Sequence, residues 1–456
     1  MTLWLATAAL LIVLTLGYGF GYRFAETSWP LYFGLWSLTL LPIFLAMIAS
    51  QVPDKNSSRR LAWPAWLAPS APALMFCVTV YFWLPSSRAL PVVIAIITAT
   101  CALLYSRRYS AALALPLVGN VLLALVLIAS STLQRSEADM LPVIIDANNY
   151  LLNGSDPYIQ SYGGSYFYYL PLQWLVFFPA AFWNFDPRIE NFVFLIAATA
   201  VALWLAYRRQ ISEPALTMLL CLIVSRIGME MILRGQVWPY WLLILGFGLA
   251  LLHERFTIAT IVAGMLIAAQ QPALLIVALF GLYVLVHFGW RKAVFLGAIG
   301  LATYLVIMGP WLWHRPALIN ELYVVVQQRI AADHALQPVY DQREISLLNL
   351  LQATGLGWLR SPFQLAFVAA GALAIVARGR RMTTAHLLCV IGTVFVGCIS
   401  LNVQVFKYYY YPGLFCLALG LSAALPDRSA YRAAQRPPGA GGRMNPGAVA
   451  RSSLAL

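Results

Sequence analysis

Two aspartates in a long polar segment are well placed for acid–base chemistry. Asp139 and Asp146 stand seven residues apart, a spacing that lets two side chains share one face of a helix. Pro142 lies between them and argues against one continuous helix. A carboxylate exposed at a membrane surface can take the proton of a hydroxyl group as a general base. Either aspartate is therefore a candidate base.

The residues that follow carry a turn and a group of aromatic rings. A short helix is expected to end near Asn153 with Gly154 as its C-cap, and Ser-Asp-Pro at 155–157 is a turn signal. Aromatic residues follow this turn at 162 and 166–169. They are typical of the aromatic belt at a membrane interface, and they also suit stacking on a sugar ring. Both interpretations stay open. The candidates for sugar contact are Tyr158, Tyr168 and Tyr169.

Cationic groups on this side of the predicted membrane are few, and each could hold a phosphate. Lys407 stands where the last apolar stretch begins, beside four tyrosines. It fits either a phosphate contact or a lysine that snorkels to the interface. Further phosphate candidates are Arg234, His314, Arg315, Arg329 and His334.

One pair of ionisable residues falls inside an apolar stretch. Arg226 and Glu230 lie one helical turn apart, toward the end of that stretch near Arg234. They either neutralise each other and fix helix packing or line a cavity for a substrate.

The sequence lacks the residue patterns of nucleophilic, nucleotide-binding and metal-dependent sites. No Ser/His/Asp order, phosphate-cradling glycine loop or HExxH motif stands out, and no spacing predicts a metal site. The six cysteines form no CxxC pair and lie in apolar stretches, which indicates buried residues without a redox or zinc role. No metal and no cofactor are expected.

The elements that must position these residues are membrane-spanning helices. Of 456 residues, 61% are hydrophobic and 10% are charged, and the mean hydropathy is +0.77. A soluble domain has about 25% charged residues, so this composition excludes an ordinary cytosolic enzyme, a disordered chain and a disulfide scaffold. It indicates an all-α, polytopic transmembrane helical protein.

The pattern predicts about 14 spans, because about 20 apolar residues cross a bilayer core in a helix. Residues 1–19 are expected to remain as a span rather than a cleaved signal peptide, since no positive charge precedes them. Residues 170–183 contain two prolines and are expected to be interfacial or re-entrant. The predicted spans are 3–19, 30–50, 71–85, 89–105, 111–131, 191–207, 215–233, 239–252, 257–271, 272–288, 294–312, 361–377, 384–400 and 408–424.

Charge placement predicts the orientation. With the N-terminus in the cytoplasm, most of the 29 Lys and Arg residues fall inside, so the net charge of +13 is an orientation signal and no nucleic-acid partner is expected. Most of the 16 acidic residues fall outside, nearly all in two long loops at 132–190 and 313–360. Long loops in a compact protein are usually functional.

Three blocks of sequence resemble glycosyltransferase family 87. The first runs from Asp139 to Pro179 and contains YLLNGSDPY and YLPL, with a closing FP. The second is Arg-Gly-Gln-Val at 234–237, followed by Ala-Gly at 263–264 and Gln-Pro at 271–272. The third is Ser-Leu at 346–347 with Gly355. The resemblance covers about residues 110–424, although Gln271 stands where the family usually has lysine.

This resemblance implies a GT-C fold and a reaction. Family members transfer hexoses, mannose among them, from polyprenyl-phosphate donors to lipid or glycan acceptors, and they invert the anomeric carbon. The loop aspartate is the base, which by motif position is Asp139, with Asp146 as the runner-up. A cation stabilises the leaving lipid phosphate. By the same resemblance, Gln236 belongs with the substrate-binding candidates.

The predicted organisation has three regions. Residues 1–105 are an extra N-terminal transmembrane module, residues 106–425 a GT-C-like core, and residues 426–456 a disordered cytoplasmic tail. The predicted location is the cell membrane, among membrane lipids, with an extracytoplasmic active site. Two other classes stay open: a transporter or flippase of lipid-linked sugars, with broken helices in both halves, and a polysaccharide polymerase or ligase.

Overall fold

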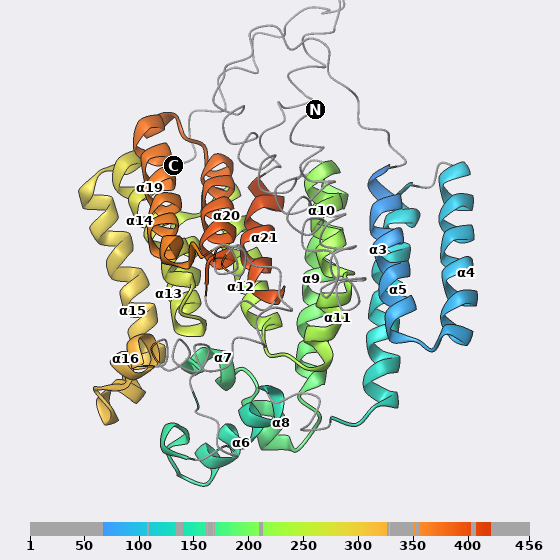
Figure 1. Cartoon of the computed structure of the whole chain (residues 1–456), viewed down its shortest axis with the longest axis horizontal. Coiled ribbons are helices and arrows are strands. Elements are labelled where there is room, and N and C mark those ends of the chain that lie inside the picture. Colours follow the sequence, from blue (N-terminus) through green and yellow to red (C-terminus); the bar gives the residue numbers. More distant parts are fainter. Residues whose placement is uncertain are drawn as a thin grey trace, which may run out of the picture.

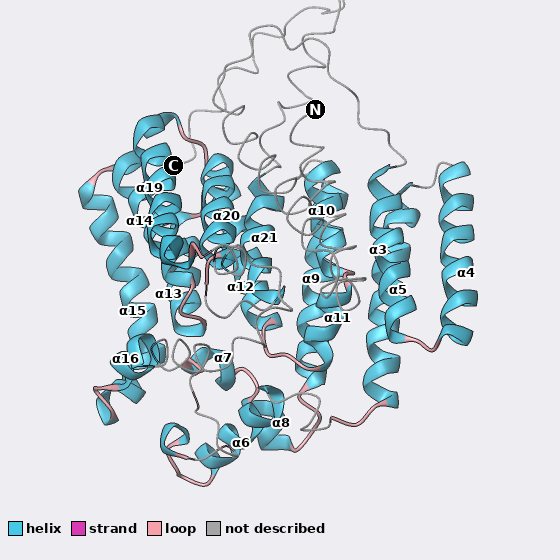
Figure 2. Cartoon of the chain, in the orientation of Figure 1, coloured by secondary structure: helices cyan, strands magenta, loops and turns pink. Residues whose placement is uncertain are grey.

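The chain is a bundle of helices in the computed structural model (Figure 1). The structure describes residues 67–106, 109–133, 140–160, 162, 167, 169–208, 213–325, 328, 348, 351, 355–402 and 407–420. Within these ranges the ordered elements are helices and none is a strand (Figure 2). The all-α prediction is therefore confirmed. The predicted spans at 3–19 and 30–50 and the tail at 426–456 lie outside the described residues.

The longer helices run up and down the bundle in alternation. They are α3 (Leu67–Trp83), α4 (Ser86–Tyr105), α5 (Tyr109–Ser130), α9 (Arg188–Arg208), α10 (Glu213–Ile223), α11 (Arg226–Leu233), α12 (Trp238–Leu252), α13 (Phe256–Ala269), α14 (Ala273–Phe288), α15 (Trp290–His314), α19 (Arg360–Arg378), α20 (Thr384–Ser400) and α21 (Tyr411–Gly420).

Shorter helices lie mostly at the ends of the bundle. They are α6 (Met140–Leu152), η1 (Pro157–Ile159), α7 (Pro171–Leu175), α8 (Phe178–Trp183), α16 (Leu318–Asn320), η2 (Glu321–Val325), η4 (Gly357–Leu359), η5 (Gly379–Arg381) and η6 (Lys407–Tyr410). Figure 1 shows α6, α7, α8 and α16 together at one end, called here the loop end, and the turn between α19 and α20 at the opposite end. Helices α6, α7 and α8 of the first predicted loop and α16 of the second thus share one end.

Several helices are long and apolar enough to cross a membrane. Among the described residues there are five: α4, most of α5, α9, α15 and the segment Gly357–Arg381. The pair α10 and α11 makes a sixth if it is counted as one bent span. A membrane protein is therefore supported, and the larger number of about 14 spans stays a prediction.

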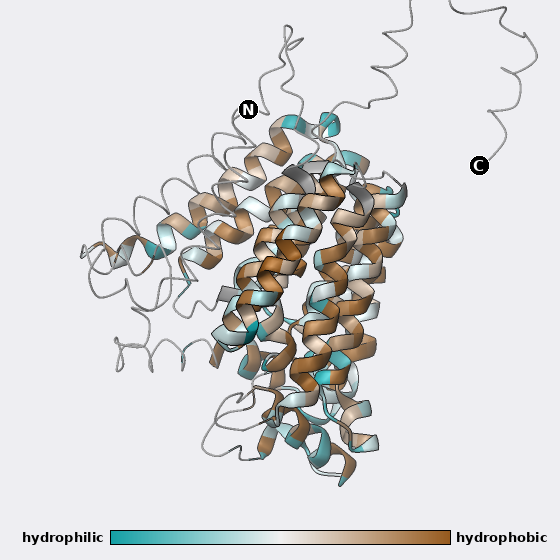
Figure 3. Ribbon diagram, turned by 90° about the vertical axis from the view of Figure 1, so that its right-hand side faces the viewer, coloured by the Kyte–Doolittle hydropathy of each residue, from teal (hydrophilic) through white to brown (hydrophobic). Residues whose placement is uncertain are grey.

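The outer surface of these helices suits lipid. Apolar side chains on α4, α15 and α19, such as Ile94, Phe295 and Leu365, are exposed. Figure 3 shows apolar residues along the length of the helices. An exposed apolar surface of this extent would drive aggregation in water, so it indicates contact with acyl chains.

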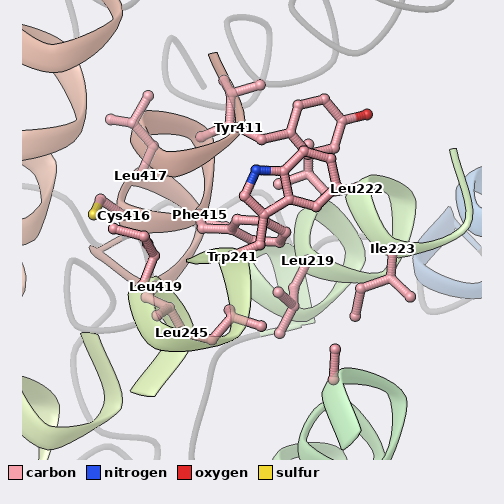
Figure 4. Packing of buried hydrophobic residues seen from close by; sticks show 14 of the residues in the cluster. Leu219, Leu222, Ile223, Trp241, Leu245, Tyr411, Phe415, Cys416, Leu417 and Leu419 are labelled. Carbon is pink, nitrogen blue, oxygen red and sulfur yellow. The ribbon is translucent and has the colours of Figure 1, made fainter. Parts of the chain in front are cut away.

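The interior is built from aromatic rings and small residues. The Trp241 ring of α12 stacks on Tyr411 of α21 with 4.4 Å between centroids, and Phe415 lies against both (Figure 4). Glycines let backbones approach closely where helices cross. A Cβ at Gly392 of α20 would lie 2.6 Å from the carbonyl oxygen of Gly413 on α21. Small residues at crossings are typical of membrane helices.

Two local predictions need correction. The predicted span at 215–233 is not continuous, because α10 and α11 meet at an angle of 41°. The break falls at Ser225, a residue type that prefers the N-cap of a helix to its interior. Pro142 does not prevent a helix, because α6 begins at Met140 and Pro142 lies in its first turn. The backbone N–H groups of a first turn have no partner within the helix, so a proline there costs no helical hydrogen bond.

Candidate functional site

Helix α6 positions Asp146 on the loop end. Asp146 is half-buried, and the next turn is fixed by Asn148, whose Nδ2 donates to the carbonyl of Ile144 at 3.0 Å and to that of Trp174 at 2.9 Å. The predicted end of this helix is confirmed, since Gly154 follows it with a φ of +73°. Asp139 directly precedes α6 but lies outside the described residues.

Tyr158 is the centre of a hydrogen-bonded group in the first loop. Its hydroxyl donates to the carbonyl oxygen of Tyr169 at 2.9 Å and accepts from Nε1 of Trp174 at 3.1 Å. Asp156 fixes the turn, because its Oδ1 accepts from the backbone N–H of Tyr158 at 2.9 Å. Burial, above all, raises the pKa of the Tyr158 hydroxyl. Sugar contact by Tyr158 and Tyr169 stays a prediction, and Tyr168 lies outside the described residues.

The charges of two carboxylates act on a neighbouring tyrosine. The Tyr162 hydroxyl donates to the carbonyl of Pro157 at 2.8 Å, and its ring stacks on Phe167. Burial raises the pKa of Tyr162, and the nearby Tyr150, Asp146 and Asp156 raise it further. Asp146 and Asp156 therefore belong to one cluster. We call it the loop cluster, and its members are Asp146, Asp156, Tyr158, Tyr162 and Trp174.

The end of α15 ties the second predicted loop to this cluster. Arg315 pairs with Glu321, with Nη2 2.8 Å from Oε2, and its Nη1 lies 3.9 Å from Oδ2 of Asp156. The Trp311 ring packs against Trp174 at 5.2 Å between centroids. Residues about 150 positions apart in the chain thus form one surface at the loop end.

The break between α10 and α11 is closed by polar side chains of other helices. The carbonyl of Val224 accepts from Oγ1 of Thr79 at 2.8 Å, and that of Ile223 accepts from Nδ2 of Asn120 at 3.3 Å. Ser225 accepts from the N–H of Gly228 at 3.0 Å, and its hydroxyl lies 2.5 Å from that of Tyr411. Backbone groups freed by a break need such partners inside a membrane.

Two arginines of this region lie against aromatic rings at the end of α3. The guanidinium carbon of Arg226 is 3.1 Å from the centroid of Phe82, and that of Arg234 is 5.7 Å from that of Trp83. Arg226 and Glu230 are on the same short helix α11, as their spacing predicts. Helix α3, from the predicted N-terminal module, also contacts α10 and α11.

The turn between α11 and α12 contains Gln236. It is 2% exposed, and its Oε1 accepts no hydrogen bond from the described part of the chain. Asn191 of α9 holds this turn, since its Nδ2 donates to the carbonyls of Ile232 at 3.2 Å and Gly235 at 2.6 Å. Buried acceptors are normally paired, which makes this oxygen a candidate contact for a bound group.

One contact joins the region of Asp139 to that of Lys407. The Tyr408 hydroxyl of η6 lies 3.6 Å from Sδ of Met140, the first residue of α6. The backbone of Lys407 begins η6, and η6 also contacts α11. Helix η6 therefore contacts both the start of α6 and α11, although Met140 and Tyr408 are 268 positions apart.

The structure thus divides the predicted site residues into two groups. Asp146, Tyr158 and Tyr169 lie in or beside the loop cluster, whereas the group of α11 and the turn after it includes Arg226, Glu230, Arg234 and Gln236. His334 lies outside the described residues. Within the described residues, no three His, Cys, Asp or Glu side chains gather as metal ligands would.

Three residues of these groups have no site role predicted from the sequence: Asp156, Glu321 and Asn191. The turn signal at 155–157 pointed to the backbone role of Asp156, but no local pattern indicates its approach to Arg315. Asn191 carries no signal either, because its partners lie about 40 residues further along the chain.

Comparison with known proteins gives no family. The chain matches no family profile, no curated protein and no solved structure.

Proposed function

We propose that this protein is a membrane glycosyltransferase. It moves a hexose from a polyprenyl-phosphate donor to a hydroxyl of a lipid or glycan acceptor, at the extracytoplasmic surface. The observation that carries the proposal is the contact between Tyr408 and Met140, because it brings the residue next to Asp139 to the residue next to Lys407. A base and a phosphate-binding cation must lie near each other to act on one glycosidic phosphate bond.

In this reaction Asp139 takes the proton of the acceptor hydroxyl. The oxygen attacks the anomeric carbon in line, the bond from that carbon to the phosphate oxygen breaks, and the configuration inverts. The polyprenyl phosphate leaves with the bonding electron pair, and Lys407 stabilises its charge. Asp146 is the alternative base. Arg234 and His334 are further candidates for the phosphate.

The surroundings support a sugar at this end of the bundle. The buried Oε1 of Gln236 can accept from a sugar hydroxyl and thereby gain the partner that it lacks within the described residues. Tyr150, one helical turn after Asp146 on α6, is only partly buried and offers a ring on which a sugar can stack. The exposed apolar helix faces suit a donor whose tail stays in the lipid.

The decisive experiment combines activity with two matched variants. Purified protein in liposomes is incubated with a panel of polyprenyl-phosphate hexoses and candidate acceptors, and release of polyprenyl phosphate is measured. Asp139→Asn should lower turnover by about 10²–10⁴-fold, the usual contribution of a positioned base, with donor binding intact. Asp146→Asn, seven residues away, is the control. If only the control loses turnover, Asp146 is the base.

The break between α10 and α11 favours one other function, which the same liposomes test. Broken helices with ionisable residues are typical of transporters, and Arg226 lies directly after this break. If an intact lipid-linked sugar moves between leaflets without release of polyprenyl phosphate, the protein is a flippase and not a glycosyltransferase.

A further inference from the structure

Five cationic side chains gather at the end of the bundle opposite the loop end. Arg291 and Lys292 begin α15, and Arg378, Arg380 and Arg381 end α19 and form η5. Four of them are exposed, and Arg378 is half-buried. We call these five residues the basic patch.

The fold brings these two turns together through α14. Helix α14 contacts α15, α19 and η5. The Tyr283 hydroxyl of α14 donates to the carbonyl of Met382, the residue after η5, at 3.5 Å. The basic patch is therefore one surface assembled from parts of the chain about 90 residues apart. Orientation in a membrane requires only that such charges lie on the correct side, and it does not require that they converge.

The residues around the patch are of the types found where headgroups and acyl chains meet. Trp290 is 65% exposed beside it, as expected of a tryptophan at a membrane interface. Lys292 is held above aromatic rings, with Nζ 4.0 Å from the centroid of Phe288 and 5.6 Å from that of Phe256. Its ammonium group is therefore held close to aromatic rings of α13 and α14.

The charged residues of the turn next to the patch are of both signs. The adjacent turn between α12 and α13 carries Glu254 and Arg255, which together add no net charge. Five cations on one surface repel one another, so an anion that several of them share stabilises the arrangement. Guanidinium groups bind phosphate through two parallel hydrogen bonds, which favours a phosphate oxyanion as that ligand.

An apolar surface for the rest of a lipid lies along the same helices. Leu285 of α14, Val294 of α15 and Val376 of α19 are exposed, and each stands within about two helical turns of the patch. A ligand with a phosphate at one end and acyl chains at the other matches this arrangement of charge and apolar surface.

We propose that the basic patch is a binding site for an anionic phospholipid, which places its headgroup phosphate among the arginines of α15 and η5 and its acyl chains along α14. Basic pockets between membrane helices on the cytoplasmic side bind such headgroups in general. The proposal is independent of the reaction at the loop end.

Native mass spectrometry of the full-length protein tests this site. The protein is taken from nanodiscs of phosphatidylcholine with a small share of phosphatidylglycerol, and the retained phosphatidylglycerol is counted. We expect wild type to keep it selectively. Arg380→Gln with Arg381→Gln should weaken binding about 30-fold, since each basic residue near an anionic surface contributes about 1 kcal/mol and 1.4 kcal/mol is tenfold.

Two further variants make the result decisive. Arg88→Gln removes an exposed arginine near the loop end and should leave retention unchanged. Arg291→Gln with Lys292→Gln removes the other half of the patch and should repeat the loss, and it replaces the first variant if that one does not fold. Thermal stability in pure phosphatidylcholine verifies the fold. Equal retention by all variants, or an equal loss in Arg88→Gln, would overturn the proposal.

Discussion

Asn191 is a single buried side chain that holds a whole turn of the bundle. Its Nδ2 donates to carbonyl oxygens at the end of α11, those of Met231, Ile232 and Gly235 among them. Met231 and Ile232 belong to the last turn of α11, where carbonyl groups run out of helical N–H partners, and Gly235 lies in the turn that follows. The position of Gln236 in the candidate site therefore depends on a residue of another helix.

Asn191→Ala should lower the free energy of unfolding by about 1–3 kcal/mol, because buried carbonyl groups lose their donor. The measurement is the thermal unfolding midpoint of the purified protein in detergent, followed by gel filtration after heating. Asn149→Ala is the control, since Asn149 is exposed on α6. Equal midpoints for both variants would show that the turn does not depend on Asn191.

Helices α13 and α15 cross at a close distance. A Cβ added at Gly264 would lie 2.5 Å from the carbonyl oxygen of Gly300 and 2.9 Å from Cβ of Thr303. Backbone atoms cannot turn aside as a flexible side chain can. The close approach of α13 and α15 therefore requires glycine at 264.

Gly264→Ala should force the two helices apart and cost about 1–3 kcal/mol of stability, the usual penalty for overpacking. Gly297→Ala on α15 is the matched control, because its added Cβ meets no atom within 4 Å. Alanine is favoured over glycine in a helix by about 1 kcal/mol, so the control should be as stable as wild type or more so. Thermal midpoints in detergent compare them, and a stable Gly264→Ala would contradict the crossing.

The whole molecule has two chemically different ends. One end carries the acidic and aromatic loop cluster, and the other carries the basic patch. Because positive loops stay in the cytoplasm, the patch is expected inside and the loop cluster outside. The same orientation places the proposed active site on the extracytoplasmic face.

Cysteine labelling of whole cells measures this orientation directly. In a chain whose six native cysteines are replaced, Asn153→Cys at the loop end should react with a membrane-impermeant maleimide in intact cells. Arg380→Cys should react only after the membrane is permeabilised. Both side chains are exposed, so access to the reagent decides the result. The reverse pattern would place the basic patch outside and remove the support for an extracytoplasmic active site.

Much of the helical architecture is determined by the sequence alone. Long apolar stretches must form helices in a membrane because their backbone groups find no water there. Most described residues of the predicted spans from 71–85 to 408–424 are helical, although the span at 215–233 is broken. The end of α6 is also predictable from the sequence, because helices commonly end at a glycine with a positive φ, as Gly154 has here. Asp146 was identified as a candidate from its type and its setting.

The tertiary structure decided which of these residues lie together. The contact of Met140 with Tyr408, the pairing of Arg315 with Asp156 and the two halves of the basic patch join distant parts of the chain. The break at Ser225 persists because Thr79 and Asn120 of other helices pair its carbonyl groups. Local pattern encodes hydropathy and turns, whereas these contacts depend on how helices of similar apolar composition choose their neighbours. Which helices pack together depends on the shapes of their surfaces and on a few buried polar groups. The periodic spacing of apolar residues does not specify these features.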